Sequence, residues 1–304
     1  MRKIKFVQRT HGISKIPYVD TVMKHCVFDG DDDFGDFIRV KPHLFYDRIS
    51  LYEYTNYQTH QKIFGAGALT NAAIMYHYGD VISFVDDDFG DVTYLDTMML
   101  DLAKPEIIKH WSNDLVKPDG HEMPYDEFVR MAYDLMGSDN VVQLGTYGKP
   151  AEVIDRTTLF TGNPTAKHCI SGVTAKMVSK SFWFTPSILD TTMIEFPTIA
   201  FARHEDTCLG AMNQIRSITL PAFIHHKGER HNIDNDSALD YLVYNYIMSV
   251  MQGMPNREIC PPKNDMQLWL EMNFRMLCED CKNLKSQEDK KKFVESIFYH
   301  GEMP

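Results

Sequence analysis

The sequence predicts an α/β fold: a three-layer sandwich with a mixed, mainly parallel sheet and a C-terminal helical extension. Over the first half of the chain, short β-branched and apolar runs alternate with segments of helical periodicity, as in strands joined by crossover helices. After about residue 235 the strand-like runs stop and helical periodicity continues alone. We therefore expect an α/β domain over residues 1–234 and a helical extension over residues 235–304.

The first elements are predicted from local patterns. Residues 3–10 are an apolar and β-branched run that predicts the first strand. Ser14 is a good helix cap and Pro17 suits a first helical turn, which predicts a helix from Ser14 to about Cys26. A second strand is expected within residues 45–54.

The later elements follow from the same signals. A helix over residues 71–78 is expected to lead into an apolar strand that ends at Asp86. Residues 125–136 predict a helix ending at Gly137, and residues 141–144 predict a short strand. The extension predicts three helices: residues 239–250, residues 264–284 and a last one from Ser286. We interpret the apolar side chains of the middle helix as packing surface, namely Leu268, Trp269, Met272, Met276 and Leu277.

Composition limits the classes of function. A formal net charge of −11 argues against a general nucleic-acid binder, which needs a phosphate-neutralising surface, but permits a local basic pocket. No apolar run approaches the length of a membrane span, and the N-terminus resembles a strand more than a signal peptide, so we expect a cytoplasmic protein. The six cysteines are scattered, as expected for reduced thiols. Cys278 and Cys281 form one isolated CxxC, which favours helix thiols over a zinc site.

The acidic run Asp86-Asp87-Asp88 directly follows a predicted strand. Each carboxylate raises the cost of ionising the next, and a divalent cation such as Mn²⁺ or Mg²⁺ would remove that cost. The alternative is a solvated acidic turn. The same six letters, DDDFGD, occur at residues 31–36, but no strand of useful length is expected before that copy and it does not fit an EF-hand loop. We interpret residues 29–36 as an acidic surface loop and residues 86–88 as the functional copy.

The run from Asn71 through Gly79-Asp80 to the acidic triplet resembles the nucleotide-sugar-binding segment of family-2-like glycosyltransferases of the GT-A fold. In that family an Asn opens a helix, a Gly-Asp turn follows, and a strand ends in an Asp-x-Asp signature. The sequence departs from the family at three positions, with Thr70 for a usual Arg, Ala73 for a common Gly and His77 for a common Ala. The missing arginine leaves the diphosphate contacts incomplete.

Two later stretches resemble the same family. Glu205-Asp206 is similar to the motif that opens a helix before a strand with a terminal histidine, here His225-His226. Residues 170–173 and 175–182 resemble the glycine-containing acceptor-side loop and its helix. The resemblance covers about residues 3–230 and implies a nucleotide-sugar-binding part over about residues 1–100 and an acceptor-side part over about residues 101–234.

The resemblance implies transfer of a sugar from a nucleoside-diphosphate sugar, most simply a UDP-sugar, to an acceptor hydroxyl, with inversion at the anomeric carbon. Asp206 is the implied general base, with Glu205 beside it. The divalent cation, Mn²⁺ or Mg²⁺, is assigned to Asp86 and Asp88, with His225 or His226 completing its ligands. The implied donor-binding residues are Thr10, His11, Asn71, Asp86, Asp87, Lys227 and Arg230.

Two other functions remain open from the sequence. A sugar-phosphate nucleotidyltransferase could share this kind of sheet, although the loop after the first strand lacks the glycine density typical of such enzymes. A non-catalytic nucleotide-sugar-binding module is the other alternative. The sequence does not identify the acceptor, which could be a glycan, a lipid, a protein or a modified DNA base.

Overall fold

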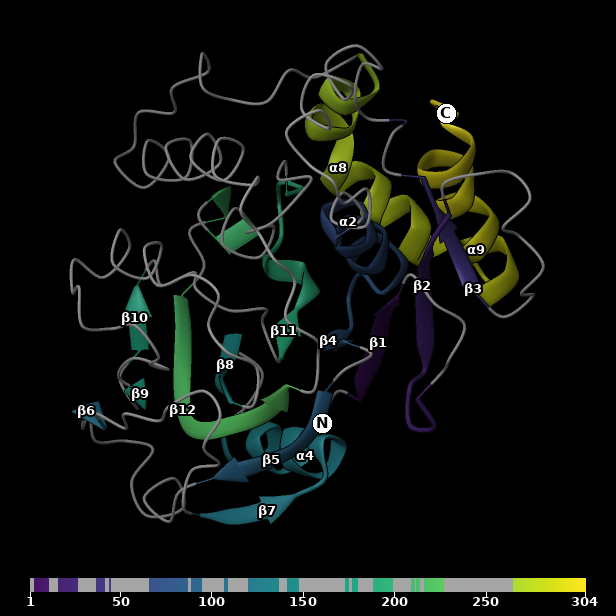
Figure 1. Cartoon of the computed structure of the whole chain (residues 1–304). Helices are drawn as coiled ribbons and strands as arrows, with labels where there is room; N and C mark the ends of the chain where they lie inside the picture. Colours follow the sequence, from purple (N-terminus) through teal and green to yellow (C-terminus); the bar gives the residue numbers. More distant parts are fainter. Residues whose placement is uncertain are drawn as a thin grey trace, which may run out of the picture.

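A computed structural model describes residues 3–10, 16–26, 37–41, 44, 66–86, 89–94, 107–108, 120–136, 141–147, 173–174, 177–179, 188–198, 209–210, 212–213, 216–226 and 265–304. Its first sheet has five strands in the order β11-β4-β1-β2-β3 (Figure 1). The pairs β1–β2, β1–β4 and β2–β3 are parallel, and only β11 is antiparallel to its neighbour. The strands are β1 (Ile4–Thr10), β2 (Thr21–His25), β3 (Phe37–Val40), β4 (Val81–Asp86) and β11 (Leu189–Asp190).

A second sheet is built around the long strand β12 (Arg216–His226). Its order is β10-β12-β5-β7, and β8 also pairs with β12, in the parallel direction. The chain passes directly from the first sheet to the second, because β5 begins at Phe89, three residues after β4 ends at Asp86. The other strands are β5 (Phe89–Tyr94), β7 (His121–Met123), β8 (Val141–Tyr147) and β10 (Met177–Ser179), with a separate small pair of β6 (Ile107–Ile108) and β9 (Val173–Thr174).

Helices cover both faces of the first sheet. Neighbouring strand residues alternate between two apolar clusters, so that Val7 packs with α2 and α8 whereas Phe6 packs with α4. The α2 side also receives the C-terminal helices, which lie beside β3 in Figure 1. The helices are α2 (Ala66–Tyr76), α4 (Tyr125–Met136), α8 (Asp265–Asn283), α9 (Gln287–Glu295), the π-helical turn η5 (Ser296–His300) and the 3-10 turn η3 (Thr191–Met193). The α/β composition, the mixed and mostly parallel sheet and the C-terminal helices confirm the predicted class at this coarse level, whereas the GT-A form of the sandwich stays a prediction.

The predicted helix over residues 14–26 is wrong. Residues 17–18 form a turn and residues 21–25 form strand β2. Val22 faces the α4 cluster and Met23 faces the α2 cluster, and this alternating burial in the sheet outweighs a weak helix cap. The helix predicted within residues 175–182 is also wrong where the structure describes it, because Met177–Ser179 is strand β10.

Other predictions are confirmed with shifted bounds. Strands β1, β4 and β8 and helices α4, α8 and α9 lie where they were expected, with β8 extending to Tyr147. Helix α2 begins at Ala66, five residues before the predicted start. Ser286 caps α9 by accepting a hydrogen bond from the Asp289 amide at 3.0 Å. The strand predicted within residues 45–54 and the helix predicted over residues 239–250 lie outside the described residues.

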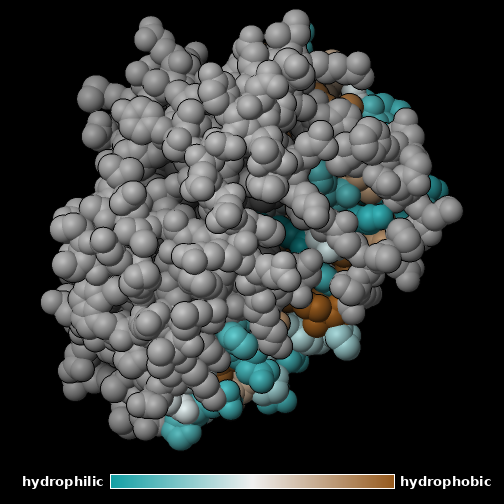
Figure 2. Space-filling view, viewed as in Figure 1, coloured by the Kyte–Doolittle hydropathy of each residue, from teal (hydrophilic) through white to brown (hydrophobic). Residues whose placement is uncertain are grey.

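The prediction that the apolar stripe of α8 is packing surface is only partly correct. Leu277 is buried and Trp269 is partly buried. Leu268, Met272 and Met276 are 47%, 85% and 56% exposed, respectively. Burial instead falls on Met266, Gln267, Leu270, Phe274, Leu277, Cys278 and Cys281. On the face shown in Figure 2, the described surface is mainly hydrophilic, with a few hydrophobic side chains between. Among the described residues, no helix combines the length and apolar character needed to span a membrane.

Candidate functional site

The parallel strands of the first sheet end at one common edge, which we call the carboxyl edge. In the sheet ladder Arg9 pairs with Asp86 on one side and with Met23 on the other. Thr10 pairs with Lys24, and His25 pairs with Val40. In open α/β sheets, ligands bind beyond this edge because the loops that leave the strands converge there.

The acidic triplet lies where the chain leaves this edge. Strand β4 ends at Asp86 and β5 begins at Phe89 in the other sheet. The backbone of Asp86 is described, whereas its side chain and all of Asp87 and Asp88 lie outside the described residues. The expected position of the triplet, at the end of a buried parallel strand, is confirmed for the backbone of its first residue.

The end of β12, which carries the two predicted histidines, pairs with the start of β5. His226, the last residue of β12, pairs with Phe89, the residue that follows Asp88. His225 pairs with Tyr147 of β8, and a register shift lies between Ile224 and His226. Such irregularities re-aim side chains at the ends of strands. Segments more than a hundred residues apart in the sequence therefore meet beside the acidic triplet.

The premise that no strand precedes the first copy of the acidic hexamer is wrong. Strand β2 ends at His25, six residues before Asp31. Because β2 and β4 both flank β1 in parallel, the strands that precede the two hexamers end at the same edge of the sheet, about 10 Å apart. Residues 27–36 themselves lie outside the described part of the chain.

The side chain of Asn71, a predicted donor-binding residue, forms two hydrogen bonds with the backbone of Thr198. Its Nδ2 donates to the carbonyl oxygen of Thr198 at 3.0 Å, and its Oδ1 accepts from the Thr198 amide at 2.8 Å. Both residues are buried. Asn71 thus fastens Thr198, which lies seven positions before Glu205 in the sequence, to helix α2.

Among the remaining predicted site residues, Thr10 is described and the others are not. Thr10 is buried at the end of β1, at the carboxyl edge. Leu209 and Gly210 are helical, as expected for a helix opened by Glu205-Asp206. Those predicted site residues that lie outside the described part of the chain are His11, Glu205, Asp206, Lys227 and Arg230.

Sequence reasoning missed Arg9. Its side chain lies at the carboxyl edge, and Nη1 donates to Oγ1 of Thr70 at 3.0 Å. The guanidinium carbon lies 5.0 Å from the centroid of the Phe84 ring. The only signal in the sequence was a charged residue inside a buried strand, a placement that costs free energy unless a ligand or partner compensates the charge. Other buried basic side chains at or just past this edge are Lys24, His25 and Lys41.

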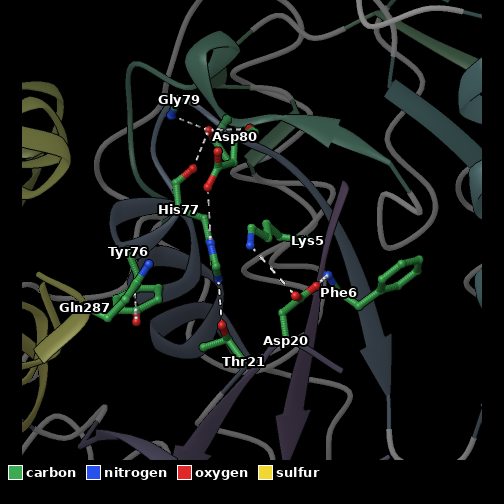
Figure 3. A network of polar contacts seen from close by, with 10 residues as sticks. Lys5, Phe6, Asp20, Thr21, Tyr76, His77, Gly79, Asp80 and Gln287 are labelled. Atoms are coloured by element: carbon green, nitrogen blue, oxygen red, sulfur yellow. Dashed lines mark hydrogen bonds and ion pairs between the residues drawn. The ribbon is translucent and has the colours of Figure 1, made fainter. Parts of the chain in front are cut away.

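His77 and Asp80, part of the family-like segment, lie at the opposite edge of the sheet. Figure 3 shows His77 between Thr21 and Asp80, with Nε2 3.0 Å from Thr21 Oγ1 and Nδ1 3.6 Å from Asp80 Oδ2. Burial lowers the pKa of His77, and the contact with His77 lowers the pKa of Asp80. This network therefore supports the fold and is not part of the site at the carboxyl edge.

The Gly79-Asp80 turn is held from a distant segment. The hydroxyl of Thr191 accepts from the Gly79 amide at 2.9 Å, and the Thr191 amide donates to the Asp80 carbonyl at 3.1 Å. Gly79 has a φ of +95°, which favours glycine. The turn positions the start of β4, and hence the strand that ends at Asp86.

The chemistry of the donor set fits a divalent cation. Two carboxylates from Asp86 and Asp88, with an imidazole from the end of β12, would together form an oxygen-rich set of the kind that Mn²⁺ and Mg²⁺ prefer. Within the described residues, no cluster of three or more His, Cys, Asp or Glu side chains is placed to hold a metal ion. Burial raises the pKa of both Cys278 and Cys281, which keeps these helix thiols protonated at neutral pH.

Compared with known proteins, the chain matches no family model, no curated protein and no solved structure. The resemblance to glycosyltransferases therefore stays a prediction that rests on the sequence motifs.

Proposed function

We propose that this chain is a metal-dependent glycosyltransferase of the GT-A type, which transfers a sugar from a UDP-sugar to an acceptor hydroxyl. One observation supports it most strongly. The pairing of His226 with Phe89 brings the end of β12 beside the acidic triplet, at the ligand-binding edge of a parallel sheet. Two of the segments on which the resemblance rests, the end of β4 and the end of β12, therefore lie close together through the start of β5.

The proposed reaction is a single displacement. The acceptor oxygen forms a bond to the anomeric carbon while the bond from that carbon to the phosphate oxygen breaks, and the diphosphate leaves with the electron pair. Asp206 accepts the proton of the acceptor hydroxyl. Asp86 and Asp88 would hold the divalent cation, which would supply positive charge to offset the charge on the diphosphate. Displacement from the face opposite the leaving group inverts the anomeric carbon.

The first experiment measures UDP binding by isothermal titration calorimetry with and without Mn²⁺. We expect metal-dependent binding in the wild type, its loss in Asp88→Ala, and its retention in the control Asp91→Asn, which removes an exposed carboxylate of β5. Asp33→Ala makes the equivalent change in the other hexamer and should leave binding intact. If Asp88→Ala binds as well as the wild type, the proposed metal site is wrong.

The second experiment screens nucleotide sugars for metal-dependent hydrolysis, which identifies the donor and narrows the choice of acceptor. Asp206→Asn should keep UDP binding but reduce turnover by a factor of about 10² to 10⁴, because it removes a general base. Formation of a nucleotide sugar from UTP and a sugar phosphate would instead identify a nucleotidyltransferase. UDP binding without turnover of any donor would favour a non-catalytic module.

A further inference from the structure

The guanidinium group of Arg9 lies beside Thr70 at the carboxyl edge of the first sheet. We propose that Arg9 contacts the phosphate groups of the nucleotide donor, in the place that Thr70 leaves without an arginine. This inference rests on the proposed function, because it identifies a further residue of the same site.

Contacts with Thr70 and Phe84 help to fix the position of Arg9. Its Nη1 donates to Oγ1 of Thr70 at 3.0 Å, and its guanidinium carbon lies 5.0 Å from the centroid of the Phe84 ring. Arg9 is only 9% exposed, so its side chain loses little further freedom when it binds a ligand. Arg9 comes from β1 and Thr70 from α2, and their hydrogen bond joins the sheet to the helix at the carboxyl edge.

The chemistry of this position suits phosphate. A buried guanidinium is costly unless an anion compensates it, and its planar set of donors matches phosphate oxygens. The family that the sequence resembles usually has an arginine at the position of Thr70, on the helix. In this chain Thr70 stands at that position, and the guanidinium of Arg9, on strand β1, donates a hydrogen bond to it.

The competing role for Arg9 is to neutralise the acidic triplet, because Asp86 is its partner in the ladder. The two roles predict different changes in the binding of Mn²⁺ and of phosphate ligands. Removing a positive charge that neutralises the carboxylates should strengthen Mn²⁺ binding. It should leave unchanged what the phosphate groups contribute to the binding of UDP and pyrophosphate. Removing a phosphate contact should weaken binding of UDP and of pyrophosphate, both in the presence of Mn²⁺.

The test measures binding of Mn²⁺ alone, Mn²⁺ with UDP and Mn²⁺ with inorganic pyrophosphate. Arg9→Gln removes the charge, and Thr70→Val removes only the hydrogen bond that orients it. Arg9→Gln/Thr70→Arg returns a guanidinium from the helix side. Arg130→Gln is the matched control, because its guanidinium carbon lies 4.8 Å from the Phe6 ring in the α4 layer, away from the edge.

We expect Arg9→Gln to weaken UDP and pyrophosphate binding about tenfold or more, Thr70→Val to weaken both about threefold, and the double variant to recover most of the loss. Mn²⁺ affinity should stay unchanged. If Arg9→Gln does not fold, Thr70→Val decides the question, because valine is nearly isosteric with threonine.

Metal-dependent UDP binding in the wild type with equal binding in Thr70→Val and Arg9→Gln would overturn this inference alone. Tighter Mn²⁺ binding in Arg9→Gln would also overturn it, in favour of the neutralising role. A wild-type protein that binds no UDP in the presence of Mn²⁺ would overturn the proposed function together with it.

Discussion

Arg39 and Glu295 lie 256 positions apart in the sequence and are joined by three hydrogen bonds. Glu295 Oε1 accepts from the backbone amide of Arg39 at 3.0 Å and from its Nε at 3.1 Å, while Oε2 accepts from Nη2 at 2.7 Å. β3 is the edge strand of the first sheet. A carboxylate at the end of α9 thus accepts a hydrogen bond from the backbone of β3, the outermost strand in the described order of the first sheet, and covers that strand.

Glu295→Ala should therefore lower the free energy of unfolding by about 3 kcal/mol, because it leaves a backbone amide and a half-buried guanidinium without their carboxylate. Urea unfolding followed by circular dichroism measures the change. The matched control is Glu288→Ala on the same helix, which breaks the exposed i,i+4 pair with Lys292. That variant should change stability by less than about 0.5 kcal/mol. Equal effects would show that the Arg39 contact contributes nothing specific.

His77 makes stability depend on pH. Its pKa is lowered from 6.5 mainly by burial, with Asp80 and Asp20 opposing the shift and Lys5 adding to it. The unfolded chain then binds a proton more readily than the folded chain, so stability falls as pH drops below about 6.5. Asp80, whose pKa is also lowered, adds its own loss only near and below its ordinary value of 3.8.

His77→Gln should remove this contribution between pH 7 and pH 5. The wild-type slope from this residue reaches at most about 1.4 kcal/mol per pH unit, which is the value for one proton. Urea unfolding at a series of pH values measures it, with His121→Gln as a control at an exposed histidine. A slope that is the same in His77→Gln and the wild type would contradict the role of His77.

Asn71 should be required for stability through its two bonds to Thr198. Asn71→Asp cannot donate to the Thr198 carbonyl and places a buried carboxylate against it, so we expect a loss of about 2–3 kcal/mol. Asn213→Asp is the matched control, because Asn213 also bonds backbone groups through both amide atoms, but at a more exposed place. Its loss should be about 1 kcal/mol or less. If the two losses are equal, burial of the Asn71 contact has no special effect.

The elements that could be predicted have local signals. In α4, Phe128, Val129 and Ala132 repeat at helical spacing and pack on one side of the sheet. Helix α2 lacks such a pattern, because it packs between the sheet and α8 and its residues 67–75 are all buried. Its start at Ala66 was therefore missed. Strand β2 is five residues long, and only its partners in the sheet distinguish it from a helix.

The candidate site could likewise be predicted only where its residues form a local motif. The acidic triplet and His225-His226 are visible as letters in the sequence. The pairing of His226 with Phe89 depends on the register of two strands that no local pattern specifies. Arg9 carries no motif at all. Its place beside Thr70 follows from the packing of α2 on β1, which only the folded chain shows.

Mutations on the two faces of helix α8 test which face packs against the rest of the protein. Phe274 is fully buried among the residues of the α2 cluster, so Phe274→Ala should lower the free energy of unfolding by about 3–5 kcal/mol through the cavity it leaves. Met272, two positions earlier, is 85% exposed, and Met272→Gln should change stability by less than about 0.5 kcal/mol. Urea unfolding of both variants measures the contrast. A loss above about 1 kcal/mol for Met272→Gln would mean that another surface covers Leu268, Met272 and Met276 in solution, because a truly exposed methionine has no packing to lose.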